Sequence, residues 1–148
     1  LAWYRRQMKE LDVEVHLGKE IDSVEKFGDA PVIIATGSVP RVMKNIPGHE
    51  RMIEACDYLN GRDVGERVVV IGGGLTGSEI AYELALQGKR PVIVEMKNDL
   101  VAQKGVCLAN SSYLREWFEL HEVPVYLETK LKEVKEHSVI CTDKPEKR

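Results

Sequence analysis

Residues 72–77 read GGGLTG and satisfy the spacing GxGxxG. Glycine at the first position permits a tight turn, glycine at the third lets the backbone approach a pyrophosphate, and glycine at the sixth lets a helix pack closely on a strand. The exposed amides and the positive dipole end of such a helix attract phosphate charge. The spacing predicts an anion cradle made of backbone, formed by Gly72, Gly73, Gly74, Leu75, Thr76 and Gly77.

An acidic residue follows at the distance that a ribose contact requires. Glu95 comes 23 positions after Gly72 (95 − 72), close to the roughly 20 residues usual for the acid that hydrogen-bonds an adenosine ribose. A carboxylate about 4 Å from a 2′-phosphate is repelled by roughly 4 kcal/mol at an effective dielectric near 20, which favours NADH over NADPH. Lys97 lies two residues further on and can partly neutralise such a phosphate. The predicted ribose site comprises Glu95, Met96 and Lys97.

Apolar strands and one helix surround the glycines. The run VVVI at 68–71 predicts a buried strand, residues 78–88 predict a helix that ends at Gly88, and VIVE at 92–95 predicts a second strand. A helix over 107–122 and a strand over 123–128 complete a β-α-β-α-β order. Residues 131–134 and 138–142 then alternate as an antiparallel hairpin, before a charged tail. The pattern predicts an α/β, Rossmann-like three-layer domain with a parallel sheet and a β-hairpin or meander.

The first third of the chain has a different pattern. Residues 1–11 carry apolar side chains at helical spacing, and 13–17, 21–24 and 32–37 predict strands. Two prolines and a glycine make 40–48 an irregular crossing segment, which is followed by a short helix over 53–59.

Charge and composition exclude several classes of function. The net charge of −3 gives no footprint for nucleic acid or for an anionic membrane, and no apolar run approaches the roughly 18 residues of a spanning helix. We expect a soluble, cytoplasmic protein. The three cysteines and four histidines are scattered, so no metal site is predicted.

The sequence offers no catalytic dyad. Tyr126 and Lys130 match the YxxxK spacing of short-chain dehydrogenases, but they fall on a strand and its exit rather than on one helical face, which makes the match accidental. We therefore expect a binding site without catalytic residues of its own.

The segment PVIIATGSVPRVMKNIPG, followed by VVVIGGGLTGSEIAYELALQGKRPVIVE, resembles the two-dinucleotide-binding flavoproteins, or pyridine nucleotide-disulfide oxidoreductase-like proteins. The resemblance implies that residues 1–48 belong to an FAD-binding domain and that 49–148 form the NAD(H)-binding domain. Residues 1–134 look most like the C-terminal part of the old yellow enzyme-like 2-enoate and 2,4-dienoyl-CoA reductases, the NADH:flavin oxidoreductases. In such an enzyme, hydride passes from NADH to FAD, and electrons then pass through an iron-sulfur cluster to FMN, which reduces a CH-CH double bond.

The sequence departs from that family in what it lacks. The FAD domain's own glycine motif, a cluster-binding cysteine run and the barrel that holds FMN are absent. We therefore expect a fragment that binds NADH weakly and is inactive alone. We also expect it to hold no FAD, FMN or iron-sulfur cluster. Its expected partners are the dinucleotide and the remaining FAD and barrel domains of the parent enzyme. An open sheet position is expected to be filled either by the ATGS strand of the same chain or by a second copy, which would make a homo-oligomer. The alternatives are a non-catalytic dinucleotide-sensing or interaction module and an S-adenosylmethionine-binding methyltransferase, against which Gly77 and the upstream ATGS argue.

Overall fold

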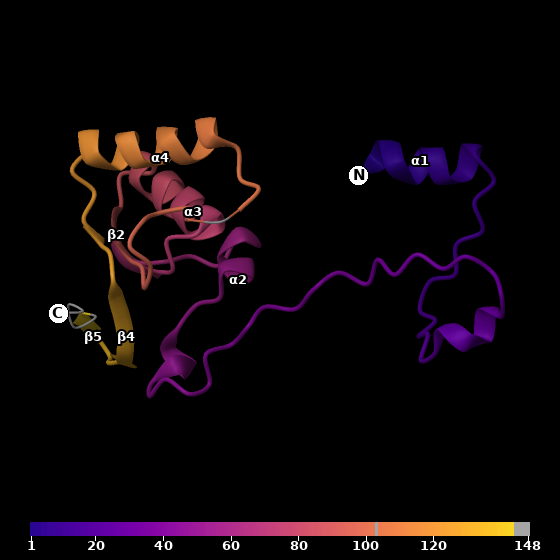
Figure 1. The fold of residues 1–148 in the computed structure, drawn as a ribbon, viewed down its shortest axis with the longest axis horizontal. Coiled ribbons are helices and arrows are strands. Elements are labelled where there is room, and N and C mark those ends of the chain that lie inside the picture. Colours follow the sequence, from indigo (N-terminus) through magenta and orange to yellow (C-terminus); the bar gives the residue numbers. More distant parts are fainter. Residues whose placement is uncertain (103, 144–148) are drawn as a thin grey trace. The chain divides into compact units, whose positions relative to one another are not determined.

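The computed structural model describes residues 1–102 and 104–143. Its contacts divide the chain into two units, Leu1–Ser38 and Val39–Arg148, which can be followed along the chain in Figure 1. The expected charged tail falls largely on 144–148, outside the described residues. No helix in the described part of the chain is long and apolar enough to cross a bilayer.

The contact-based division falls after Ser38, and the boundary after residue 48 between FAD-binding and NAD(H)-binding parts stays a prediction. Two observations agree with the place of residues 39–48 in the second unit. Ile46 is buried, and the amide of Val134 donates a hydrogen bond to the carbonyl oxygen of Pro47 at 2.9 Å.

The first unit contains little regular structure. Helix α1 (Ala2–Glu10) confirms the helix predicted over 1–11, and η1 (Val24–Phe27) is a single 3-10 turn. The strands predicted over 13–17, 21–24 and 32–37 are wrong, since no strand forms in residues 1–38. A strand requires a neighbour to satisfy its amides and carbonyls, and these segments pair with nothing in the described chain.

The second unit is built on a three-stranded parallel sheet. Strands β1 (Arg67–Ile71), β2 (Arg90–Val94) and β3 (Val125–Tyr126) lie in the order β1-β2-β3. The sheet is joined by helices α3 (Leu75–Leu86) and α4 (Leu108–Leu120), as parallel neighbours require. Strand β3 is shorter than the predicted 123–128, and at its C-terminal end the chain turns at 127–128, where Glu128 has φ +52.

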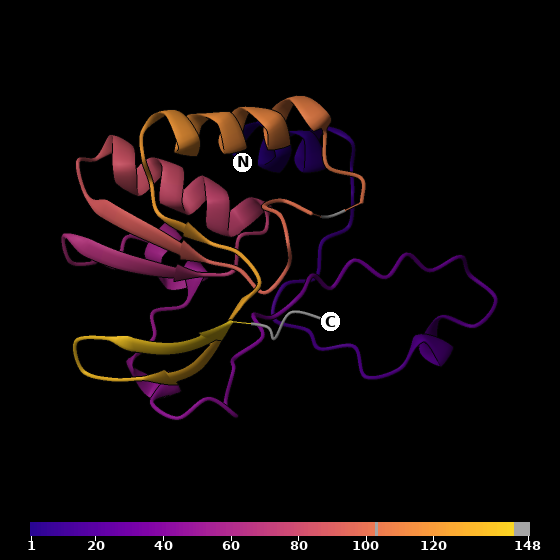
Figure 2. The same ribbon diagram turned by 60° about the vertical axis from the view of Figure 1, so that its left-hand side comes forward.

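The remaining elements complete the predicted α/β, Rossmann-like fold. Strands β4 (Thr129–Val134) and β5 (Val139–Asp143) pair as the expected antiparallel hairpin. The 3-10 turn η2 (His49–Arg51) and the short helix α2 (Ala55–Leu59) precede β1 along the chain. In the view of Figure 2, α3 and α4 lie together above the strands of the sheet and the hairpin lies below them.

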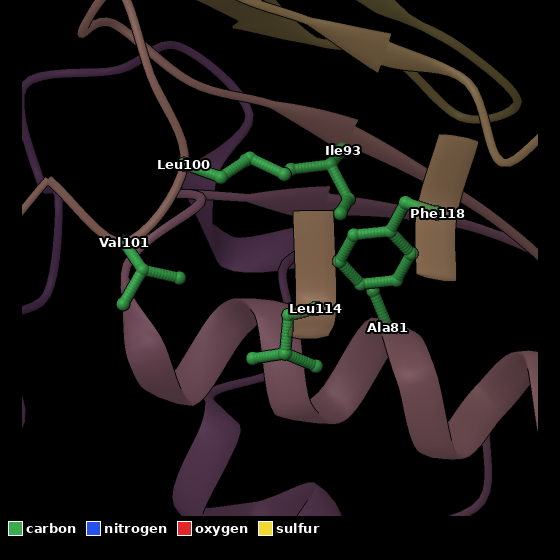
Figure 3. Close-up of a cluster of buried hydrophobic side chains, with 6 residues drawn as sticks. All are labelled: Ala81, Ile93, Leu100, Val101, Leu114 and Phe118. Atoms are coloured by element: carbon green, nitrogen blue, oxygen red, sulfur yellow. The ribbon is translucent and has the colours of Figure 1, made fainter. Parts of the chain in front are cut away.

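One hydrophobic cluster holds the helices to the sheet. It contains residues from the two helices, from the central strand and from the loop that follows that strand: Ala81, Ile93, Leu100, Val101, Leu114 and Phe118. Figure 3 shows the ring of Phe118 beside Ala81 of α3 and Ile93 of β2. Ala81 and Ile93 are fully buried and Phe118 is 1% exposed, so the small side chain on α3 leaves room for the large one on α4.

Replacing Phe118 with alanine should lower the free energy of unfolding by about 3–5 kcal/mol, because the lost ring leaves a cavity between two helices and the sheet. Urea unfolding followed by circular dichroism measures the change. Leu120→Ala, on the same helix at 79% exposure, is the matched control and should shift stability by no more than about 0.5 kcal/mol. Equal losses for the two variants would contradict the assignment of the core.

Candidate functional site

The glycine turn joins the end of β1 to the start of α3. Gly72 has φ +106, a conformation that favours glycine, and its amide donates to the carbonyl oxygen of Val94 at 2.8 Å. A side chain at Gly77 would overlap the carbonyl oxygen of Gly72. The turn is therefore tight and α3 packs directly on it, as the glycine spacing predicts.

The first turn of α3 leaves its amides available. The helix begins at Leu75 with Gly74 as its N-cap, and no side chain among the described residues caps it. Its first i→i−4 hydrogen bond runs from the amide of Ser78 to the carbonyl oxygen of Gly74 at 2.9 Å. The amides ahead of that bond, with the positive end of the helix dipole, suit an anion.

The carboxylate of Glu95 lies against the glycine turn. Glu95 directly follows Val94, the last residue of β2, and is only 9% exposed. Its Oε2 accepts a hydrogen bond from the amide of Gly73 at 2.6 Å, and its Oε1 accepts one from the amide of Lys97 at 2.7 Å. An ionised carboxylate has about four lone-pair sites, so two bonds leave acceptor capacity for a ligand hydroxyl.

Gly73 lacks a side chain because the surrounding atoms leave no space for one. A Cβ at Gly73 would overlap Cδ2 of Leu100 and would lie 3.1 Å from Cβ of Glu95. The GxGxxG spacing leaves this position open to any residue, yet the sequence has glycine there. The glycine at position 73 is thus a sequence signal that the acid lies against the turn, which the GxGxxG spacing alone does not contain.

The other predicted residues of the ribose site lie beside Glu95 in different environments. Met96 is 52% exposed, while the ammonium group of Lys97 donates to the carbonyl oxygen of Ala102 at 3.1 Å. The structure thus brings Gly73 and Glu95 into direct contact, keeps Lys97 adjacent through its backbone, and leaves Met96 at the surface.

Sequence reasoning missed three residues that support the turn. The carbonyl oxygen of Gly73 accepts hydrogen bonds from the amide of Val101 at 2.7 Å and from Oγ of Ser78 at 3.2 Å. Arg115 of α4 bonds the segment that carries Val101, through Asp99 and the carbonyl oxygen of Leu100. Of these three, Ser78 alone had a local signal, as a small polar residue next to the motif; the contacts of Val101 and Arg115 follow no sequence spacing.

Tyr126 and Lys130 form no helical pair. Tyr126 ends β3 and Lys130 lies in β4, so the two residues belong to different sheets. The interpretation of YxxxK as an accidental match agrees with this placement.

The parallel sheet, its helices and the glycine turn define a Rossmann-like α/β fold. The family model of the pyridine nucleotide-disulphide oxidoreductases matches residues 5–147, and the chain belongs to that family. Membership implies NAD(P) and FAD as the cofactors of the enzyme type. The resemblance stated from the sequence is confirmed at this level, and the placement near old yellow enzyme-like reductases stays a prediction.

Several oxidoreductases are similar in sequence. The chain is 39% identical to a cinnamate reductase of Clostridium sporogenes over 84% of this chain and 19% of that protein. It is 33% identical to a bilirubin reductase of Mediterraneibacter gnavus, over 94% of this chain and 22% of that protein. An NADH oxidase of Thermoanaerobacter brockii is 40% identical over 66% of this chain and 16% of its own length. The chain therefore spans about a fifth of the length of these relatives.

A solved structure shares the fold. A 2-naphthoyl-CoA reductase, in complex with 2-naphthoyl-CoA, matches with a TM-score of 0.72 at 24% identity, over 95% of this chain and 22% of the other. At this identity the likeness supports the fold alone.

Adding a methyl group at Gly73 should destabilise the second unit by about 1–3 kcal/mol, since the new Cβ must displace Leu100 or Glu95. Gly65→Ala is the matched control, because a Cβ there meets no atom within 4 Å. Chemical unfolding of both variants gives the comparison. If Gly73→Ala unfolds at the same denaturant concentration as Gly65→Ala, the close approach of the acid to the turn is not as described.

Proposed function

We propose that this chain is the NAD(H)-binding part of a flavin-dependent oxidoreductase and that it delivers hydride from NADH to FAD. The observation that carries the proposal is the hydrogen bond between Glu95 and the amide of Gly73 at 2.6 Å. This bond places the carboxylate of Glu95, which can accept hydrogen bonds from ribose hydroxyls, beside the first amides of α3. Those amides are uncapped and can donate hydrogen bonds to phosphate. Family membership supports the choice of a dinucleotide as the ligand.

Each part of the site has a separate role in holding the dinucleotide. The amides of Leu75, Thr76 and Gly77, at the start of α3, donate to the pyrophosphate. Glu95 accepts hydrogen bonds from the adenosine ribose through the carboxylate lone pairs that the amides of Gly73 and Lys97 do not use. NADH supplies the hydride when it is bound, and the residues of this chain hold and orient it.

The names of the relatives support a proposal for the substrate class of a longer parent enzyme. The cinnamate reductase is named for an unsaturated carboxylate, and we propose that the parent enzyme acts on the CH-CH bond of an enoate. The described residues contain no group of three or more His, Cys, Asp or Glu side chains that could hold a metal ion. They do not fit an iron-sulfur cluster, and no step of this proposal passes through a cluster or FMN.

We propose a preference for NADH over NADPH, and the charge of Glu95 supports it. The carboxylate is nearly buried, so its repulsion of a 2′-phosphate is screened less than at an open surface. The ammonium group of Lys97 is already bonded to the carbonyl oxygen of Ala102, and it offers that phosphate little compensation in this arrangement.

NADH should bind the chain at least about tenfold more tightly than NADPH, a ratio for which about 1.4 kcal/mol of repulsion suffices. Glu95→Gln removes the charge at nearly constant shape and should reduce the ratio to about one- to threefold. The 2′-phosphate of NADPH is then no longer repelled, while NADH loses a charge-assisted hydrogen bond. Fluorescence titration with NADH, NADPH and S-adenosylmethionine in parallel measures all three affinities.

Glu116→Gln removes a charge from the exposed side of α4 and serves as the control for net charge; its NADH-to-NADPH ratio should match that of the wild type. The proposal fails if S-adenosylmethionine binds in preference to both nicotinamide coenzymes. An unchanged ratio in Glu95→Gln would overturn the role of the acid.

Purified chain should carry no yellow flavin. The unit Leu1–Ser38 forms no strand that could support FAD, and the sequence has a single GxGxxG motif. The visible absorption spectrum of the protein, taken before and after adding excess FAD and desalting, tests this expectation. Retention of flavin in equimolar amount would refute it.

A further inference from the structure

We infer that Arg115 is a positioning residue for the dinucleotide site, which it serves by fixing the segment 96–101 against the glycine turn. The inference rests on the proposed function and extends it to a residue on another helix. Arg115 lies 20 positions after Glu95 (115 − 95) and belongs to α4, and it meets the site only through the segment that follows β2.

The guanidinium group holds that segment at two neighbouring residues. Its Nε donates to Oδ1 of Asp99 at 2.8 Å, and its Nη2 donates to the carbonyl oxygen of Leu100 at 2.6 Å. The side chain of Arg115 is 31% exposed and that of Asp99 is 49% exposed, so the pair is partly shielded from water. A planar fork of donors reaches two acceptors at once, which the point charge of a lysine does less well.

The held segment is also locked into the core. Leu100 and Val101 are 4% and 3% exposed, and Figure 3 shows both side chains in the cluster with Leu114 of α4. Val101 has φ +50, a conformation that β-branched residues rarely adopt and that persists only where the surroundings impose it. The two hydrogen bonds of Arg115 act on the residues just before it.

The strained residue bonds the glycine turn directly. The amide of Val101 donates to the carbonyl oxygen of Gly73 at 2.7 Å, while the amide of Gly73 donates to Glu95 at 2.6 Å. Gly73 is therefore held through both of its backbone polar groups. If the bonds of Arg115 are removed, Val101 can relax and the Gly73 carbonyl keeps only Oγ of Ser78 as a donor. The turn then holds the carboxylate of Glu95 less firmly.

The test compares Arg115→Met and Arg115→Lys with Arg90→Met in the full 148-residue chain. Arg90 forms an exposed ion pair with Glu66 at the opposite end of β2, so it matches the lost charge without touching the site. We expect Arg115→Met to weaken NADH binding about tenfold, as for a lost charge-assisted hydrogen bond. The NADH affinity of Arg115→Lys should lie between those of Arg115→Met and the wild type. Arg90→Met should bind NADH as tightly as the wild type does.

A double-mutant cycle separates positioning from a general loss of stability. If Arg115 acts through Gly73 and Glu95, Arg115→Met in the Glu95→Gln background should cost less than about threefold, because the acid it positions is already gone. Exchange of the Gly73 amide hydrogen, measured by NMR without ligand, should be faster in Arg115→Met than in Arg90→Met. Asp99→Asn removes the charged half of the contact and replaces Arg115→Met if that variant does not fold.

The outcomes distinguish this inference from the proposed function. Wild-type chain that binds no NADH overturns the function and the site together. Wild-type binding with an unchanged affinity in Arg115→Met, or with losses that multiply fully across the cycle, overturns the positioning role and leaves the proposed function standing.

Discussion

The hydrogen bond from the amide of Gly73 to the carboxylate of Glu95 is the constraint on which the second unit's site depends. It joins the turn after β1 to the end of β2 across 22 residues of chain, beside the sheet bond from Gly72 to Val94. Glycine is required at position 73 because the acid and Leu100 occupy the space of a side chain. This contact thereby places a negative charge beside the first amides of α3.

The second unit could be predicted from the sequence because its signals are local. The apolar run at 68–71, the glycines and the helical spacing after them each specify conformation within a few residues, and they agree with one another. The strands predicted over 13–17, 21–24 and 32–37 failed for a physical reason. Alternation reports a preference for extended backbone, but a strand forms only where another supplies hydrogen bonds, and sequence alone does not show whether that neighbour is present.

The geometry of the candidate site could be predicted only in part, for the same reason. The motif and the acid can be recognised by spacing, whereas Val101 and Arg115 are brought to the turn by packing between α4 and β2. A valine with positive φ has no sequence signature. The family assignment accounts for the fold and for the cofactors of the enzyme type. The chain spans about a fifth of its relatives' length, so the activity of the whole protein stays a proposal.

Leu100 and Val101 serve the core and the site at once, and this double duty limits how the protein can be re-engineered. Their side chains pack with Leu114 and Phe118, while their backbone meets Arg115 and Gly73. Any replacement of the loop after β2 therefore also repacks the interior of the second unit. Conversely, a substitution that tightens the interior at these two positions shifts the backbone that bonds the glycine turn, so the stability of the unit and the geometry of the turn change together.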